Sequence, residues 1–263
     1  MDECLGEFLS LWPFCEIVTE RLFKAQQKEY LSAVARRIEE SDQHWLFRPG
    51  INAVIEQLVQ AQTTGKLYGC FILSNNGSQH VVDCIRQILN LRAIRMGSRK
   101  DLFLTGWSRN SSCRKGDMKK SLEEIETCLA SEGFPGVRKL LFFDDMNHVL
   151  SREIPDYIQV SAYTYYTPVD LVQHILSPVF QQLRIAPSIL QAVMKRAKVM
   201  EHADRKDSWL RLSSPSPTKW TDAMDAILRF FHSPKRTHKR SGTRKGKSHS
   251  IQKTKKSKLW TRY

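Results

Sequence analysis

The chain has 263 residues and an apolar share of 41%, which is enough for a core of enzyme size. Its formal net charge is +14, but residues 234–263 contain 12 Lys or Arg and no Asp or Glu, so +2 remains for the other residues. No run approaches the roughly 18 apolar residues of a membrane span, and the N-terminus lacks the basic-then-apolar order of a signal peptide. A membrane or secreted protein is not expected, and a cytoplasmic or nuclear location is favoured.

The cysteines form no C-x-x-C pair and do not cluster with His at the spacing of a metal site. We therefore expect reduced thiols at all six positions, which are Cys4, Cys15, Cys70, Cys84, Cys113 and Cys128.

Two helices are predicted before the first strand. Between Glu16 and Glu40 apolar residues recur mostly three, four or seven positions apart, which is the spacing of one helical stripe. The residues Arg48-Pro49-Gly50 break this pattern, and a second amphipathic helix runs from Ile51 to near Gly65. The apolar run that follows, Leu67–Leu73, is typical of a strand and ends on turn-forming residues at 74–77.

From there the chain alternates between helices and strands. The predicted elements are a helix through Val81–Leu89, a strand at Leu102–Leu104, a helix over Asp117–Ala130, strands at Leu140–Phe143 and Tyr157–Val160, and a helix that begins at Pro168. This alternation predicts the α/β class, with a parallel sheet that is covered by helices on both faces.

After Leu183 the pattern is helical, in two pieces over Pro187–Ala203 and Thr221–Phe231. We therefore expect an α/β domain over residues 1–183 with a small helical insertion at about 7–47, a helical extension over 184–232, and a basic tail over 233–263. The tail is rich in Lys, Arg, Ser, Thr and Gly and cannot bury enough apolar surface to offset the entropy of ordering. We expect it to be disordered when free.

Polar residues that follow strands are candidates for a site, because ligands of a parallel sheet gather beyond the carboxyl ends of its strands. Ser74 follows one apolar run, Asp144 and Asp145 follow another, and Asp2 lies at the start of the chain. Adjacent carboxylates repel each other unless a cation lies with them, and Mg²⁺ prefers carboxylate oxygens together with waters and a phosphate. Each feature alone is more typical of a turn or a helix cap; their order along the chain is what predicts a site.

These motifs resemble those of the haloacid-dehalogenase (HAD) superfamily, and most closely those of its protein phosphatases. That superfamily has four ordered motifs, namely D-x-D after the first strand, Ser or Thr after the second, Lys at a helix start, and an acidic pair after the fourth. The matching segments are Met1-Asp2, Phe71-Ile72-Leu73-Ser74, Lys120-Ser121-Leu122-Glu123 (with Lys119 or Lys115 as alternatives) and Phe142-Phe143-Asp144-Asp145. The similarity covers roughly residues 1–170.

The resemblance implies a HAD-like, Rossmann-type fold and a Mg²⁺-dependent phosphatase. In that family the first Asp of D-x-D attacks phosphorus and the second acts as general acid and then base. By this resemblance Asp2 would be the general acid and base and would offer its main-chain carbonyl to the metal. Ser74 would bind the phosphate, and Lys120 would offset the negative charge of the phosphoryl group. Asp144 and Asp145 would bind Mg²⁺. Residues 7–47 leave no room for a large cap, so the resemblance implies an open site that could admit a phosphoprotein.

One part of the pattern lies outside the given sequence. Met1 stands at the middle position of D-x-D, so the nucleophilic Asp and the apolar strand before it would precede the first residue. That strand is central to the sheet of the family, and without it we expect a gap between two halves of the sheet. Either the protein begins upstream, which predicts an in-frame apolar run followed by Asp in the gene, or the chain is an inactive relative.

The alternative function is a non-catalytic interaction module on the same fold. The tail contains clusters such as Lys235-Arg236 and Lys253-Thr254-Lys255-Lys256, which are typical both of nucleic-acid-binding segments and of signals read by an import receptor. Composition does not separate these two partners.

Overall fold

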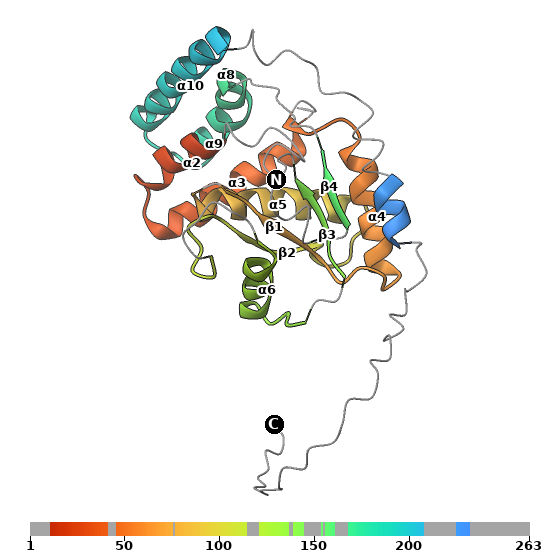
Figure 1. Ribbon diagram of the computed structural model, residues 1–263. Coiled ribbons are helices and arrows are strands. Elements are labelled where there is room, and N and C mark those ends of the chain that lie inside the picture. Colours follow the sequence, from red (N-terminus) through yellow and green to blue (C-terminus); the bar gives the residue numbers. More distant parts are fainter. Residues whose placement is uncertain are drawn as a thin grey trace, which may run out of the picture. The chain divides into compact units, whose positions relative to one another are not determined.

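Figure 1 shows a computed structural model of the chain, which is of mixed α/β class. The structure describes residues 11–41, 46–75, 77–114, 121–136, 139–144, 154, 156–160, 168–207 and 225–231. The chain divides into two units, Met1–His232 and Ser233–Tyr263, and every described residue belongs to the first. The expectation of a disordered tail therefore falls outside the described residues.

Three described helices precede the first strand, and they are α2 (Leu11–Thr19), α3 (Lys24–Glu40) and α4 (Ile51–Thr63). The prediction of one helix over Glu16–Glu40 is wrong, because the chain breaks between α2 and α3. The side-chain amide of Gln27 donates hydrogen bonds to the carbonyl oxygens of Thr19 (2.7 Å) and Leu22 (3.0 Å). These bonds satisfy carbonyl groups at and just beyond the C-terminus of α2 that a continuous helix would have paired internally.

The predicted helix after Gly50 is confirmed. Gly50 has a φ of 85°, a left-handed conformation that favours glycine, and it directly precedes α4. Gly65 follows the helix with a φ of 70°. The two glycines bracket α4 because both ends need a backbone conformation that other residues rarely adopt.

The described strands form two parallel pairs. β1 (Cys70–Leu73) pairs with β2 (Phe103–Trp107), and β3 (Leu141–Asp144) pairs with β4 (Asp156–Gln159). The predicted strands and their parallel pairing are confirmed. The prediction of a single sheet is not confirmed, because within the described part of the chain no hydrogen-bonded ladder joins one pair of strands to the other.

Helices α5 (Gln79–Arg95) and α6 (Leu122–Ser131) connect β1 to β2 and β2 to β3. Successive side chains of a strand point to opposite faces, so the partners of alternate residues identify the layers. One cluster of apolar residues joins both strand pairs to α6, and its members include Phe71, Leu73, Phe142, Ile125 and Leu129. A larger cluster joins both pairs to α3, α4 and α5, and its members include Ile72, Leu141, Phe143, Val34, Ile55 and Ile88.

The two strand pairs therefore lie in one layer, with α6 on one face and α3, α4 and α5 on the other (Figure 1). This is the arrangement expected of an α/β domain with parallel strands.

The C-terminal helices pack on the larger cluster. They are α8 (Pro168–Asp170), the π-helical segment η2 (Leu171–Leu176), α9 (Ser177–Gln182) and α10 (Pro187–Asp207). The apolar stripe of α10, which includes Ile189, Val193 and Ala197, belongs to that cluster, and residues 225–231 are also helical. None of the helices in the described segments is both long and apolar enough to cross a bilayer.

Candidate functional site at the carboxyl ends of the strands

Two of the predicted site residues are described, and both are buried at the end of a strand. Ser74 directly follows β1, is 0% exposed, and its main-chain N–H donates to the carbonyl of Trp107 at 2.9 Å. Asp144 is the last residue of β3, is 1% exposed, and its main-chain carbonyl accepts from the N–H of Val160 at 2.8 Å. The ladder with the neighbouring strand thus fixes the backbone of each residue.

Helix α6 places these two strand ends at the same edge. Near its N-terminus, Glu124 pairs with Arg114, which also donates to the carbonyl of Ser74. Just beyond its C-terminus, the ring of Phe134 lies 5.4 Å from the ring of Tyr68, which precedes β1. The chain therefore returns along α6 to the starting end of β1 before β3 begins, so β1 and β3 run in the same direction.

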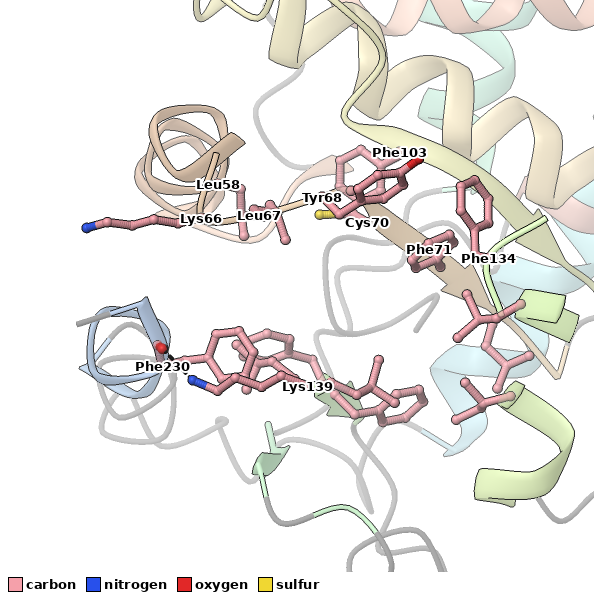
Figure 2. Close-up of a pocket in the computed structure, with 18 of the residues that line it drawn as sticks. Leu58, Lys66, Leu67, Tyr68, Cys70, Phe71, Phe103, Phe134, Lys139 and Phe230 are labelled. Atoms are coloured by element: carbon pink, nitrogen blue, oxygen red, sulfur yellow. Dashed lines mark hydrogen bonds between the residues drawn. The ribbon is translucent and has the colours of Figure 1, made fainter. Parts of the chain in front are cut away.

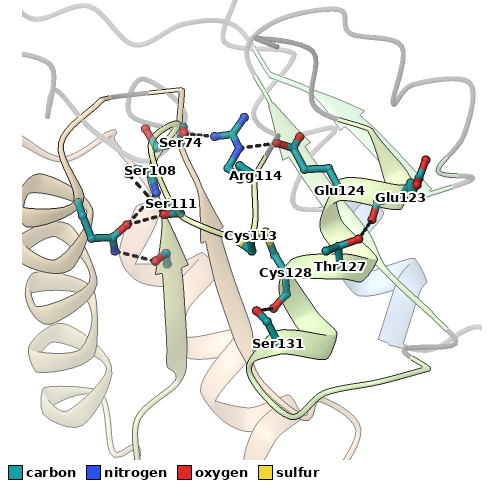
Figure 3. Close-up of a disulfide and its surroundings, with 12 residues drawn as sticks. Ser74, Ser108, Ser111, Cys113, Arg114, Glu123, Glu124, Thr127, Cys128 and Ser131 are labelled. Atoms are coloured by element: carbon teal, nitrogen blue, oxygen red, sulfur yellow. Dashed lines mark hydrogen bonds and ion pairs between the residues drawn. A yellow bond between two sulfur atoms is a disulfide. The ribbon is translucent and has the colours of Figure 1, made fainter. Parts of the chain in front are cut away.

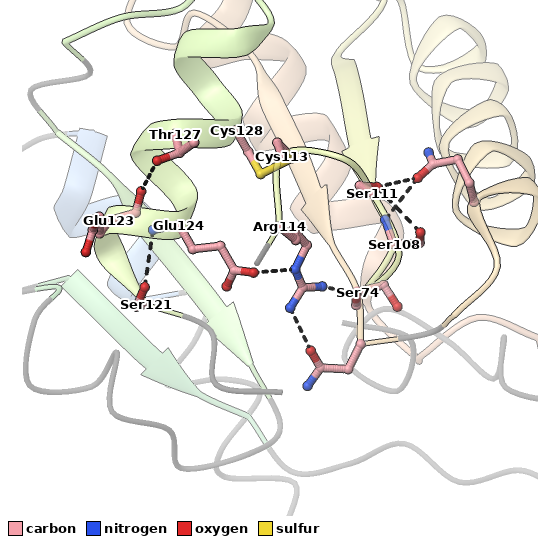
Figure 4. A network of polar contacts seen from close by, with 12 residues as sticks. Ser74, Ser108, Ser111, Cys113, Arg114, Ser121, Glu123, Glu124, Thr127 and Cys128 are labelled. Carbon is pink, nitrogen blue, oxygen red and sulfur yellow. Dashed lines mark hydrogen bonds and ion pairs between the residues drawn. A yellow bond between two sulfur atoms is a disulfide. The ribbon is translucent and has the colours of Figure 1, made fainter. Parts of the chain in front are cut away.

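Arg114 is the cation that the structure places beside Ser74 (Figure 4). Its side chain is 1% exposed, its Nε donates to Oε1 of Glu124 at 2.7 Å, and its Nη2 donates to Oδ1 of Asn75 at 3.1 Å. One guanidinium thus holds the end of β1 against the first turn of α6, a fork geometry that lysine cannot reproduce. Sequence reasoning missed this residue because it follows no strand directly and matches no motif.

The loop that carries Arg114 is anchored to the start of α5. Oε1 of Gln79 accepts from the N–H of Ser108 (3.0 Å) and from the hydroxyl of Ser111 (2.8 Å). The side-chain amide of Gln79 also donates to the carbonyl of Gly106 at 2.9 Å. A single glutamine therefore positions the segment between β2 and Arg114.

A disulfide between Cys113 and Cys128 joins the same loop to α6 (Figure 3). The expectation of six reduced thiols is wrong for this pair. Their Cα atoms lie 5.0 Å apart, within the range that a disulfide bridges, although the two residues are 15 positions apart and belong to different elements. Only the fold brings them together, so the spacing of cysteines along the chain could not reveal the pair.

Replacing Cys113 by serine should lower the free energy of unfolding by about 3 kcal/mol, because cross-linking a loop of this length removes that much chain entropy from the unfolded state. Urea denaturation of the variant and of the oxidised chain measures the difference. The control is Cys15→Ser, because Cys15 is free. Its effect on the free energy of unfolding should be the same under reducing and oxidising conditions. Equal stability of the chain with and without a reductant would contradict the prediction.

The other described cysteines, Cys15, Cys70 and Cys84, are free. Burial raises the pKa of the Cys70 thiol to about 12. The side chain is only half-buried, so at about pH 8 we expect its alkylation by iodoacetamide, mapped by mass spectrometry, to be slower than that of an ordinary thiol by about tenfold or more. The raised pKa favours the neutral thiol in the folded state, so this contribution to stability is present below about pH 9 and is lost as the pH rises toward 12. Rapid labelling of Cys70 in the native chain would contradict this expectation.

Several predicted site residues lie outside the described residues. These are Asp2, Asp145 and Lys120, and the alternatives Lys119 and Lys115. The described part of the chain contains no group of three or more His, Cys, Asp or Glu that could hold a metal. Asp144 is still a suitable ligand for Mg²⁺, since this ion takes oxygen donors and the carboxylate is buried at the edge where ligands of parallel strands gather.

In comparisons with known proteins, no protein-family model, no curated protein and no solved structure matches the chain.

Proposed function

We propose that the domain is a HAD-like, Mg²⁺-dependent phosphatase that acts on phosphorylated substrates, including phosphoproteins. The observation that supports it best is the placement of Ser74 and Asp144, two buried polar residues, at the carboxyl edge of neighbouring parallel strands. Ligands of parallel strands gather beyond these carboxyl ends, so a hydroxyl and a carboxylate that both lie there favour a site over a simple turn.

In this proposal each residue has one role. The hydroxyl of Ser74 donates to a phosphoryl oxygen, and Lys120 offsets the charge of the phosphoryl group. Asp144 and Asp145, with the main-chain carbonyl of Asp2, hold Mg²⁺, which neutralises charge on the phosphoryl oxygens when bound. Asp2 protonates the leaving group and then takes a proton from the attacking water. The nucleophilic carboxylate would come from the residue before Met1.

Arg114 has a positioning role. Its Nε, Nη1 and Nη2 donate to Glu124, Ser74 and Asn75, and its side chain is buried. A guanidinium with its nitrogens already engaged holds the backbone of Ser74 in place and does not contact the phosphate itself.

The test is a chain extended before Met1 by Val-Ile-Val-Phe-Asp. We expect it to hydrolyse p-nitrophenyl phosphate with Mg²⁺ and to stop when EDTA is added. Asp144→Asn should lower the rate by about 100-fold or more, as expected for loss of a group that stabilises charge in the transition state. Asp156→Asn is the matched control, since Asp156 is exposed at the opposite end of the paired strand and should leave the rate unchanged. A folded extended chain without Mg²⁺-dependent hydrolysis would reject the proposal.

The composition of the tail supports a second candidate, a non-catalytic module that binds nucleic acid through residues 234–263. Twelve basic residues without an acidic one form a segment that displaces counterions from phosphates, so its affinity should fall steeply with salt. Binding of duplex DNA and of RNA, measured by fluorescence anisotropy across salt concentrations, tests this. A flat salt response, or equal binding after deletion of residues 234–263, would exclude nucleic-acid binding by the tail.

A further inference from the structure

A disulfide and an ion pair tie two adjacent residues of one loop to one face of α6. Cys113 is bonded to Cys128, and the next residue, Arg114, pairs with Glu124 at 2.7 Å (Figure 3). Glu124 and Cys128 are four positions apart in the helix, so they lie one above the other on the same face. The position of the Arg114 guanidinium is therefore coupled to the disulfide beside it.

The disulfide is open to solvent on the side of Cys113. Cys128 is 0% exposed, whereas Cys113 is half-buried and lines a hollow beside β2 together with polar residues such as Ser111 and Ser131. The volume of this hollow is about 550 Å³, roughly 18 times the ~30 Å³ that a water molecule takes in the liquid. Thiols exchange with a disulfide by attacking a sulfur that they can reach, and exposed disulfides are the labile or regulatory ones. A small dithiol in the hollow therefore has access to Cys113.

Helix α6 is held in place by contacts that do not involve the disulfide. Cys128 belongs to the apolar cluster that joins α6 to both strand pairs, and just beyond the helix the ring of Phe134 lies 5.4 Å from the ring of Phe71 (Figure 2). Two sulfurs that are no longer bonded move apart to van der Waals contact. Because α6 is packed against the strands, most of this movement falls on Cys113 and on Arg114, which follows it in the chain.

Arg114 carries the movement to the end of β1. Its Nη1 donates to the carbonyl of Ser74, and its Nη2 donates to Oδ1 of Asn75 at 3.1 Å. The start of the loop is anchored separately, because Gln79 accepts a hydrogen bond from the hydroxyl of Ser111 at 2.8 Å. A displacement at the disulfide is therefore confined to the end of the loop. Hydrogen bonds weaken steeply when they are misaligned, so this displacement weakens the bonds that hold the end of β1.

We propose that the Cys113–Cys128 disulfide is a redox switch that positions Arg114 and, through it, the end of β1 at Ser74. In the oxidised chain the guanidinium holds this strand end, and after reduction it releases it. Disulfides in the cytoplasm or nucleus, the location that the sequence favours, are usually transient and serve catalysis or redox sensing. Control of hydrolysis by this switch rests on the proposed function, whereas the movement of Arg114 does not.

The reductant in this proposal is a dithiol. One of its thiolates attacks Sγ of Cys113 and forms a mixed disulfide, while the bond to Cys128 breaks and that sulfur leaves with the electron pair and takes up a proton. The second thiolate then attacks the sulfur of the reductant in the mixed disulfide, which closes a cyclic disulfide and releases Cys113 to be protonated. Two electrons pass from the dithiol, which is oxidised, to the cystine, which is reduced to two thiols. A small disulfide restores the oxidised chain by the reverse exchange.

The experiment follows two guanidinium groups of the full chain by NMR, before and after reduction with dithiothreitol. The Nε–H of Arg114 donates to Glu124 at 2.7 Å, and the Nε–H of Arg92 donates to Glu39 at 2.9 Å. Arg92 is the matched control, because it is also a buried arginine paired with a glutamate but has no disulfide beside it. Mass spectrometry after alkylation confirms that the disulfide is reduced.

On reduction we expect the Nε–H signal of Arg114 to lose about half of its intensity or more, because a released guanidinium exchanges its hydrogens with water faster. The carbonyl signal of Ser74 should shift, while the Nε–H signal of Arg92 persists and shows that the chain stays folded. Cys113→Ser should give the pattern of the reduced chain with and without dithiothreitol. Cys15→Ser should keep the response to dithiothreitol, because Cys15 is free.

An unchanged Arg114 signal in the reduced, folded chain would overturn the switch, as would a disulfide that excess dithiothreitol leaves intact. Isothermal titration of inorganic phosphate in the presence of Mg²⁺ tests the link to the site, and we expect binding to be about tenfold weaker after reduction. Equal binding in both states would contradict control of the site by the disulfide. Phosphate binding in neither state, together with a changed Arg114 signal, would support the switch and count against the proposed function.

Discussion

Replacing Glu39 by alanine should lower the free energy of unfolding by about 3–5 kcal/mol, because it leaves a buried guanidinium without its partner. The carboxylate of Glu39 is 4% exposed and accepts from Nε of Arg92 at 2.9 Å, joining α3 to α5. Arg92 also donates to Oδ1 of Asn52 at 2.8 Å, and its guanidinium lies 3.6 Å from the centre of the Phe47 ring. The Glu39–Arg92 pair therefore lies at the centre of a contact between three segments. Urea denaturation of the Glu39→Ala variant measures the loss of unfolding free energy.

Glu40→Ala is the matched control for this prediction. Glu40 is the next residue of α3 and is exposed, so its replacement should change stability by no more than about 0.5 kcal/mol. Arg95 approaches Glu39 at 3.4 Å but is 57% exposed, so Arg95→Ala should also have a small effect, since exposed ion pairs contribute at most about 1 kcal/mol. Equal losses from Glu39→Ala and Glu40→Ala would show that the buried pair does not stabilise the fold.

The parts of the fold that could be predicted from the sequence are those set by local pattern. Gly50 and Gly65 bracket α4 because each adopts a left-handed conformation, and turn-forming residues after Leu73 mark the end of β1. The same local signals placed Ser74 and Asp144 at strand ends. Within the described residues no ladder joins the two strand pairs, whereas the alternation of helices and strands alone predicted a single sheet.

The parts that could not be predicted depend on residues far apart in the chain. Arg92 and Glu39 belong to two different helices, and Cys113 and Cys128 meet only because α6 packs beside the loop after β2. The break between α2 and α3 depends on the side chain of Gln27, which an apolar periodicity does not record. Such contacts leave no periodic signal, because each is made by one pair of residues in one fold.

The second large effect is expected at Arg114. Arg114→Ala should lower the free energy of unfolding by about 3 kcal/mol or more, because Glu124 then remains buried without a cation. Oε2 of Glu124 is already buried and has no hydrogen-bond partner among the described residues, so the carboxylate depends on the bond that Arg114 donates to Oε1. Arg99→Ala is the control, since Arg99 is exposed and its loss should be within about 0.5 kcal/mol.

The double variant Arg114→Met, Glu124→Leu separates stability from positioning. Replacing both members of a buried ion pair by apolar residues is often neutral, so most of the stability should return. The carbonyl of Ser74 and Oδ1 of Asn75 nevertheless lose the hydrogen bonds from Arg114, so the end of β1 is held less firmly than in the original chain. In the extended chain that carries the upstream Asp, we therefore expect hydrolysis to stay low although the fold is restored. Recovery of both stability and hydrolysis in the double variant would show that Arg114 only stabilises the fold, and would remove it from the site.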